Sequence, residues 1–216
     1  DFVITWHSEG QDGGYDGIYA QIYNADGSTQ GGEFRVNTPT VYDQDTTSIA
    51  ALNDGGFIIA WESFGQDGDE NGIYTQRYDA NGASVGTEFQ VNTYTTLGQE
   101  NPVITTLNNG DFVITWHSDG QDGSGYGVYA QRYDANSQLI GVEFQVNTYE
   151  SDGQGVTSIA STNDGGFIIT WQSYNQDGSS GGVYAQRYGV NGSTIGIEFQ
   201  VNSYTLDSKE HPSIAV

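Results

Sequence analysis

A 55-residue repeat constrains the fold of this chain more than any other feature. Tryptophan recurs at this spacing four times, as do a Gln-Asp-Gly triplet and a segment that begins Glu-Phe. The tryptophans are Trp6, Trp61, Trp116 and Trp171. Such self-similarity indicates one folding unit that is used four times. We therefore treat residues 1–216 as a single repeat domain with units 1–55, 56–110, 111–165 and 166–216.

Each unit carries the pattern of four short β-strands. In the second unit, residues 48–52 form a run of small residues, and residues 57–63 are rich in β-branched and aromatic side chains. Asn53-Asp54-Gly55 between them is a strong hairpin signal. Residues 73–78 and 88–92 supply the third and fourth strands. No helical periodicity is present, so we expect an all-β fold.

The faces of the second strand favour one architecture. Phe57, Ile59 and Trp61 point to one side, while Ile58 and Ala60 point to the other. A strand that is apolar on both faces needs neighbours on both faces. Four antiparallel strands per repeat, stacked face to face around an axis, predict a β-propeller of four-stranded blades. A β-solenoid is the structural alternative, although its repeats are usually shorter.

The positions of the chain ends suggest how the ring would close. The sequence starts inside a second strand, at residues 1–6, and stops inside a first strand, at residues 213–216. Pairing of these two segments would close a four-bladed ring by strand exchange between the N- and C-terminal strands. If the natural chain continues, the same sequence forms part of a longer propeller array.

Composition excludes two classes of partner. The chain has 28 acidic and 5 basic residues, which gives a formal net charge of −23. Such a polyanion is repelled by nucleic-acid phosphates and by anionic lipid, so we expect no nucleic acid partner. No apolar run reaches the roughly 20 residues of a spanning helix, so we expect no membrane insertion.

The Gln-Asp-Gly loops are the candidate metal sites. Their aspartates are Asp12, Asp67, Asp122 and Asp177. Carboxylate oxygens on a glycine-bent backbone suit Ca²⁺, which takes hard oxygen ligands. The alternative is that each aspartate caps its own turn while glycine supplies a positive φ. Ca²⁺ is the one cofactor that the sequence suggests.

Variable loop tyrosines are candidates for sugar binding. Tyr15, Tyr126 and Tyr174 lie beside Asp, Asn and Gln residues. Aromatic planes with neighbouring amides and carboxylates are suited to glycans. The alternative is that these tyrosines cover the edges of blades.

Recognised catalytic motifs are absent, and the units are nearly equivalent. His7 and His117 share a position after the tryptophan that Glu62 and Gln172 fill in the other units, and we interpret them as polar strand ends. The many carboxylates are compatible with a paired-carboxylate glycosidase. An active site, however, needs one asymmetric set of groups. We therefore expect no enzyme and no catalytic residues.

The repeat also resembles a known family. Its motifs GFIIAWES, QDG, GIYTQRYDANG and EFQVNT are similar to tandem repeats of very large secreted bacterial and cyanobacterial surface proteins, which look like calcium-associated adhesins. The resemblance covers the whole chain. It implies a propeller-like fold, an extracellular or cell-surface location and a non-enzymatic role.

These observations together predict an extracellular structural or adhesive module. The open strand at each end is a template for pairing, so other copies of the chain or neighbouring repeats are the expected partners, with assembly end to end into a surface filament. The alternative function is a lectin-like module that binds glycans through several weak sites.

Overall fold

The computed structural model describes residues 1–11, 13–39 and 41–216, and β-strands are its only regular elements. None of these residues forms a helix that could cross a membrane. The strands are β1 (Phe2–Glu9), β2 (Asp16–Tyr23), β3 (Thr29–Arg35), β4 (Gln44–Ala51), β5 (Phe57–Phe64), β6 (Asn71–Tyr78), β7 (Ser84–Gln90), β8 (Gln99–Thr106), β9 (Phe112–Asp119), β10 (Tyr126–Tyr133), β11 (Leu139–Gln145), β12 (Gln154–Ser161), β13 (Phe167–Tyr174), β14 (Gly181–Tyr188) and β15 (Thr194–Gln200).

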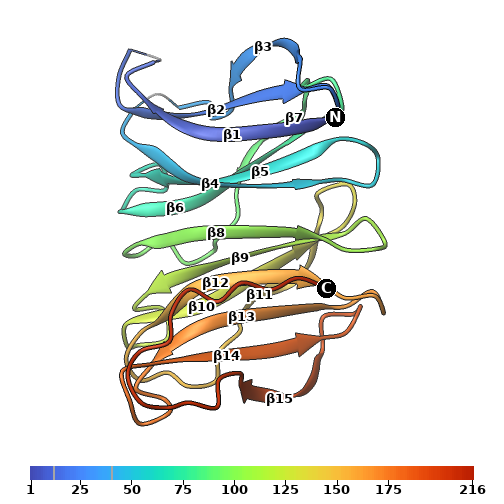
Figure 1. The fold of residues 1–216 in the computed structure, drawn as a ribbon. Helices are drawn as coiled ribbons and strands as arrows, with labels where there is room; N and C mark the ends of the chain where they lie inside the picture. The colour runs from blue at the N-terminus through green and yellow to red at the C-terminus, as the bar shows by residue number, and fades with distance from the viewer. Residues whose placement is uncertain (12, 40) are drawn as a thin grey trace.

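The strands form four antiparallel sheets, which we call blades 1 to 4. Blade 1 holds β1-β2-β3, and each later blade holds four strands in chain order. Figure 1 shows the blades stacked face to face, from the blue N-terminal blade to the orange C-terminal one. The predicted all-β propeller of four repeats is thus confirmed, and the solenoid alternative is wrong.

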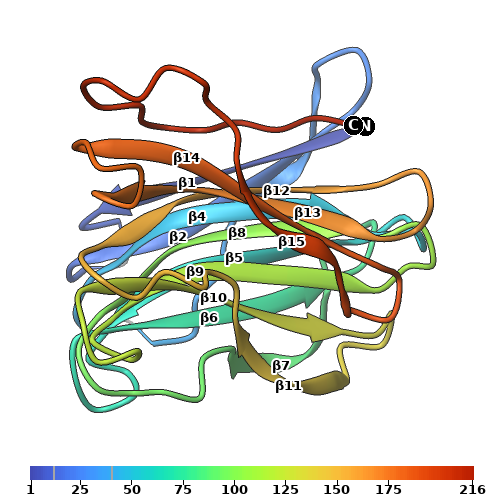
Figure 2. The same ribbon diagram turned by 90° about the horizontal axis from the view of Figure 1, so that it is seen from below.

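The first strand of each four-stranded blade is its innermost strand. Strands β4, β8 and β12 lie side by side, whereas β7 and β11 lie at the rim (Figure 2). Small side chains on these inner strands allow the close approach. Residues near the start of the inner strands therefore meet around the axis of the stack.

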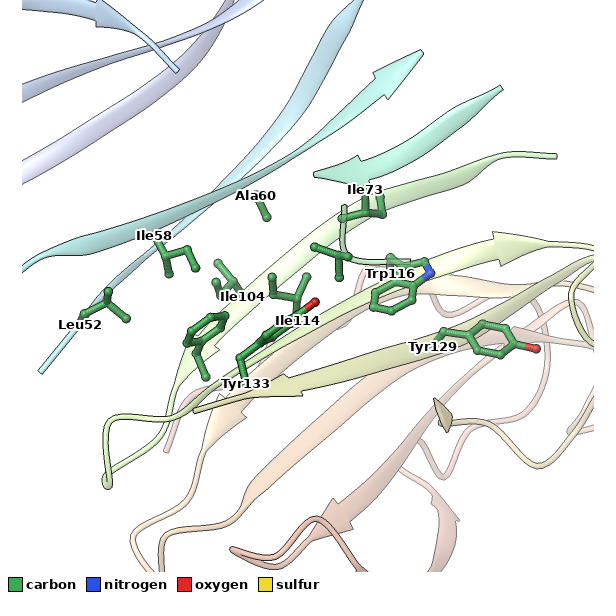
Figure 3. Close-up of a cluster of buried hydrophobic side chains, with 11 residues drawn as sticks. Leu52, Ile58, Ala60, Ile73, Ile104, Ile114, Trp116, Tyr129 and Tyr133 are labelled. Atoms are coloured by element: carbon green, nitrogen blue, oxygen red, sulfur yellow. The ribbon is translucent and has the colours of Figure 1, made fainter. Parts of the chain in front are cut away.

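Apolar side chains fill the three spaces between blades. Figure 3 shows the cluster between blades 2 and 3, where Ile58 and Ala60 of β5 face Ile114 and Trp116 of β9. Trp61, Trp116 and Trp171 are fully buried. Burying a tryptophan removes about 150–250 Å² from water, which stabilises the fold by roughly 4–6 kcal/mol. The repeated tryptophan thus marks the hydrophobic interface between blades.

A buried amide pair links each blade to the next. Oδ1 of Asn92 accepts a 2.7 Å hydrogen bond from the main-chain amide of Ile73, and its Nδ2 donates at 2.9 Å to Oε1 of Gln99. The same link recurs at Asn37 with Gln44 and at Asn147 with Gln154. The recurrent Val-Asn that follows the last strand of a blade therefore fixes the start of the following inner strand.

The strand exchange that would close the ring is not formed in this structure. β1 is an edge strand, and no pairing joins it to residues 213–216 among the residues that the structure describes. The amide of Ile214 instead donates to Oγ of Ser158 at 3.3 Å, just as Ile104 donates to Ser48 two blades earlier. The last residues thus lie beside β12, and Figure 1 places the two termini at different levels of the stack.

Candidate functional site

Each inner strand carries a β-bulge near its start. The pairing register shifts after Asp45, after Glu100 and after Gly155. The next residue has a positive φ in every case, although none is glycine: these residues are Thr46 at 44°, Asn101 at 55° and Val156 at 51°. A left-handed conformation is strained for β-branched residues, and both strain and bulges concentrate at functional sites. The three bulges therefore make the start of the inner strands, next to the axis of the stack, the candidate functional region.

The bulges set one inner-strand residue opposite one residue of the second strand. Asp45 pairs with Glu62 in blade 2, and Glu100 pairs with His117 in blade 3. In blade 4 the corresponding pair is Gly155 and Gln172. The backbone is repeated, but the side chains at this level differ from blade to blade. One asymmetric set of ionisable groups therefore sits within a nearly symmetric scaffold.

Glu62 is the buried carboxyl of this set, with an exposed fraction of 5%. Its Oε1 accepts a 2.6 Å hydrogen bond from the main-chain amide of Asn101, and its Oε2 accepts one from Nδ2 of Asn71 at 3.1 Å. Burial raises the pKa of Glu62 to about 7, and the negative charges of Asp45 and Glu100 add to this effect, although the Asn101 amide opposes it. Glu62 is therefore a carboxylic acid that holds its proton close to neutral pH.

Glu100 is the ionised carboxyl of the same set. Nε2 of His117 lies 3.5 Å from its Oε2, and the hydroxyl of Tyr126 donates to its Oε1 at 3.2 Å. The hydrogen bond from His117, the charge of that histidine and the Tyr126 hydroxyl hold the pKa of Glu100 below 4.5, against the effect of partial burial. Asn101 connects the two carboxyls. Its main-chain amide binds Glu62, and its side-chain Nδ2 lies 3.1 Å from Nε2 of His117, which is the neighbour of Glu100.

Two carboxyls with pKa values displaced in opposite directions can divide acid and base chemistry between them. At neutral pH Glu62 can donate a proton while Glu100 stays anionic. Among the residues that the structure describes, no group of three or more His, Asp or Glu side chains could hold a metal ion. Because their pKa values are displaced in opposite directions, the two carboxyls of this cluster can take part in proton transfer.

A pocket of about 130 Å³ opens beside His117, between blades 3 and 4. Its walls include two of the predicted sugar-binding residues, Tyr126 and Tyr174. The third, Tyr15, lies elsewhere, with its ring 6.2 Å from that of Tyr42. The structure thus brings Tyr126 and Tyr174 together with the carboxyl cluster and leaves Tyr15 apart.

The Gln-Asp-Gly aspartates act within their own loops. Asp12 lies outside the described residues. Oδ1 of Asp122 accepts the amide of Ser124, and Oδ1 of Asp177 accepts that of Ser179, both at 3.1 Å, which are turn-capping bonds. Two of these aspartates also bind the fourth strand of their own blade. Oδ2 of Asp67 accepts a 3.2 Å hydrogen bond from Nε2 of Gln90, and Oδ2 of Asp177 accepts a 3.1 Å hydrogen bond from Nε2 of Gln200. Calcium binding stays a prediction, and these amide donors would have to turn away from a bound cation.

Sequence reasoning missed the carboxyl cluster, although a signal was present. The residue after the tryptophan is His7, Glu62, His117 or Gln172, so this position varies in ionisable character within an otherwise regular repeat. The inner-strand position opposite it varies in the same way. Variation at a fixed place in a symmetric scaffold is the pattern expected of a site, and we instead interpreted it as polar strand ends.

Comparison with known proteins places the fold but not a family. No protein-family model and no curated protein matches the chain. Among solved structures it resembles an α-L-arabinanase of Penicillium chrysogenum complexed with arabinobiose, with a TM-score of 0.62 and 16% identity over 92% of this chain and 62% of that one.

Two further structures share the fold. One is a xylan β-1,4-xylosidase of Bacillus halodurans, with a TM-score of 0.52 and 13% identity over 99% of this chain and 43% of that one. The other is a protein of unknown function from Bacteroides caccae, with a TM-score of 0.51 and 11% identity over 87% of this chain and 56% of that one. The chain thus spans between 43% and 62% of the length of these three structures.

These findings correct the prediction of a non-enzymatic module. The arabinanase and the xylosidase are propeller enzymes that cleave glycans, whereas we expected an adhesive or structural unit, or a lectin-like one. The physical reason for the error lies in the repeat, because near-equivalence of the units does not extend to the axial residues. At such low identity the likeness itself shows only the fold. The resemblance to adhesin repeats, the extracellular location and binding to other copies stay predictions.

Proposed function

We propose that this chain is a glycoside hydrolase of the paired-carboxylate type, with Glu62 as the general acid. Such enzymes protonate the leaving-group oxygen with one carboxyl, while a second, ionised carboxylate activates water or attacks the anomeric carbon. Glu62 supplies the proton, and Glu100 is the ionised partner. Asp45 contributes negative charge that keeps the proton on Glu62.

The opposite displacement of the two pKa values carries the proposal. A solvated glutamate loses its proton well below neutral pH and cannot serve as an acid there, whereas burial keeps that of Glu62 in place up to about pH 7. His117 and Tyr126 keep Glu100 charged through the same range. Arabinan and xylan are the first substrates to test, because an arabinanase and a xylosidase share the fold.

The test compares hydrolysis by the wild-type chain, E62Q and E143Q. Release of reducing sugar from arabinan and xylan is measured at pH 6. We expect E62Q to lose activity by about 10²- to 10⁴-fold, the usual contribution of a general acid. Glutamine at this position is compatible with the fold, because Gln172 occupies it in blade 4.

E143Q is the matched control. Glu143 accepts hydrogen bonds from the amide of Thr93 and from Nε2 of Gln121, both at 2.6 Å, and it is not part of the axial cluster. We expect E143Q to keep near wild-type activity. Absence of hydrolysis by the wild-type chain, or equal activity of E62Q and E143Q, would contradict the proposal.

A further inference from the structure

The pocket beside His117 has the size of a single sugar ring. Its volume of about 130 Å³ lies between Tyr126 and Tyr174, and Gly153, Gly155 and Gln172 complete much of the lining. A cavity of about 150 Å³ accommodates one benzene molecule, so one six-membered ring matches this space. The exposed lining is almost entirely apolar, which suits the face of a ring.

Two residues of the pocket lining each carry a side-chain nitrogen that has no hydrogen-bond partner within the described protein. Nδ1 of His117 and Nε2 of Gln172 are both buried and unpaired, and the two residues are only 7% and 2% exposed. A buried polar group without a partner costs about 1–3 kcal/mol, so an arrangement of this kind calls for an explanation. A ligand that supplies the missing hydrogen bond at the pocket wall is such an explanation.

The hydroxyl group is the functional group that fits Nδ1 of His117. Nε2 of this ring faces Oε2 of Glu100 and donates to it. Nδ1 is accordingly an acceptor in the neutral ring and a donor in the charged ring. A hydroxyl both donates and accepts, and it therefore pairs with Nδ1 in either state.

Glycine at position 155 is what leaves the pocket open. The equivalent residues of blades 2 and 3 are Asp45 and Glu100, which carry side chains where Gly155 has none. A Cβ atom at Gly155 would lie 3.0 Å from Nδ1 of His117. Any side chain at this position would therefore crowd this unpaired nitrogen.

We propose that this pocket is a subsite for one pentose unit, which places a hydroxyl on Nδ1 of His117 and its ring against Tyr174. The inference rests on the proposed function, since it names where a sugar next to Glu100 would sit. The limited volume favours a pentose over a hexose, whose hydroxymethyl group needs further space. Tyr126 connects the two sites, because it lines the pocket and also donates to Glu100.

The test measures binding without turnover. D-xylose, L-arabinose and D-glucose are titrated into the full chain while the ring nitrogens of His117 are followed by ¹⁵N NMR. The chain has only three histidines, and the variant H117Q identifies the signals. We expect the two pentoses to shift the Nδ1 signal with a dissociation constant in the range of about 1–10 mM, and glucose to bind more weakly.

Two glycine variants make the test specific. G155A adds a methyl group at the pocket wall and is expected to weaken pentose binding at least tenfold. G32A is the control, because a Cβ at Gly32 meets nothing within 4 Å, and it is expected to bind like the wild-type chain. No response of His117 to either pentose, or unchanged binding in G155A, would overturn the proposal.

The outcome is separable from that of the proposed function. E62Q is expected to keep pentose binding although it loses hydrolysis. Pentose binding that depends on Gly155, in a chain that hydrolyses no glycan, would support the subsite and contradict the catalytic role. Hydrolysis of glycans by a chain in which His117 does not respond to either pentose would support the catalytic role and contradict the subsite.

Discussion

The main-chain amide of Asn101 donates a 2.6 Å hydrogen bond to Oε1 of Glu62. This contact joins blade 3 to blade 2, and it exists because Asn101 adopts a left-handed conformation at the bulge of β8. The backbone of one repeat thus orients the buried carboxyl of its neighbour. A bulge that recurs in every four-stranded blade thereby contacts, in blade 3, the carboxyl that we propose as the general acid.

The first prediction concerns stability and pH. Because burial raises the pKa of Glu62 from 4.5 to about 7, the folded chain binds more protons than the unfolded chain between these pH values. The free energy of unfolding should therefore fall as pH rises through this window, by about 3 kcal/mol in total.

Comparison with E62Q isolates this effect. Urea unfolding at pH 4.5 and pH 8 should show E62Q gaining about 3 kcal/mol relative to the wild-type chain at the higher pH. A difference between the two proteins that is the same at both pH values would mean that Glu62 titrates normally.

The second prediction concerns the pH dependence of glycan hydrolysis. Activity should decline above about pH 7, where Glu62 loses its proton. It should also decline on the acid side, where Glu100 becomes protonated, at a pH below 4.5. A profile of kcat/KM from pH 3 to 9 measures both limbs, and a profile that stays flat through pH 7 would not fit this assignment.

The third prediction uses His117. Replacement by glutamine, the residue of blade 4, removes the main hydrogen bond that lowers the pKa of Glu100. The acid limb of the activity profile should therefore move to higher pH in H117Q, while the alkaline limb stays with Glu62. If both limbs stayed in place, His117 would have no influence on the ionisation of Glu100.

The fourth prediction concerns the Gln-Asp-Gly loops. The side chain of Asp177 is 1% exposed and accepts bonds from the amide of Ser179 and from Nε2 of Gln200. D177A leaves these partly buried donors without this partner and should lower the free energy of unfolding by about 1–2 kcal/mol. The midpoint of urea denaturation measures this loss, and a midpoint equal to that of the wild-type chain would show that the loop does not depend on the aspartate.

The fifth prediction concerns association with a second copy. Phe144 packs against Tyr188 of the following blade, with 5.5 Å between the rings, whereas its counterpart Phe199 is 47% exposed. Tyr23 of blade 1 is the counterpart of Tyr188, so a second copy offers a partner for Phe199. Sedimentation should show dimers that form with rising concentration and that F199E weakens. A chain that stays monomeric would contradict this prediction.

The fold could be predicted from the sequence because its determinants are repeated. Trp61 and its equivalents, the hairpin turn at 53–55 and the two-sided apolar pattern of 57–61 all recur, so each observation was made several times. Ring closure could not be predicted in the same way. The position of residues 213–216 depends on how the blades stack, and they lie beside β12 rather than β1.

The site could be predicted only in part. Tyr126 and Tyr174 were recognised as loop aromatics, but nothing in their spacing says that they share a pocket while Tyr15 does not. The roles of Glu62 and Glu100 depend on burial and on a bulge, and both are tertiary features. Nothing in the sequence indicates which of the 28 acidic residues keeps its proton near neutral pH.

The most direct test of this account is a ¹³C NMR titration of the glutamate carboxyl groups, with the signal of Glu62 assigned by its absence in E62Q. We predict that Glu62 titrates with a midpoint near pH 7 and Glu100 with a midpoint below 4.5. If Glu62 titrated near 4.5 as a solvated carboxyl does, it could not act as a general acid at neutral pH, and the proposed division of roles between the two glutamates would be wrong.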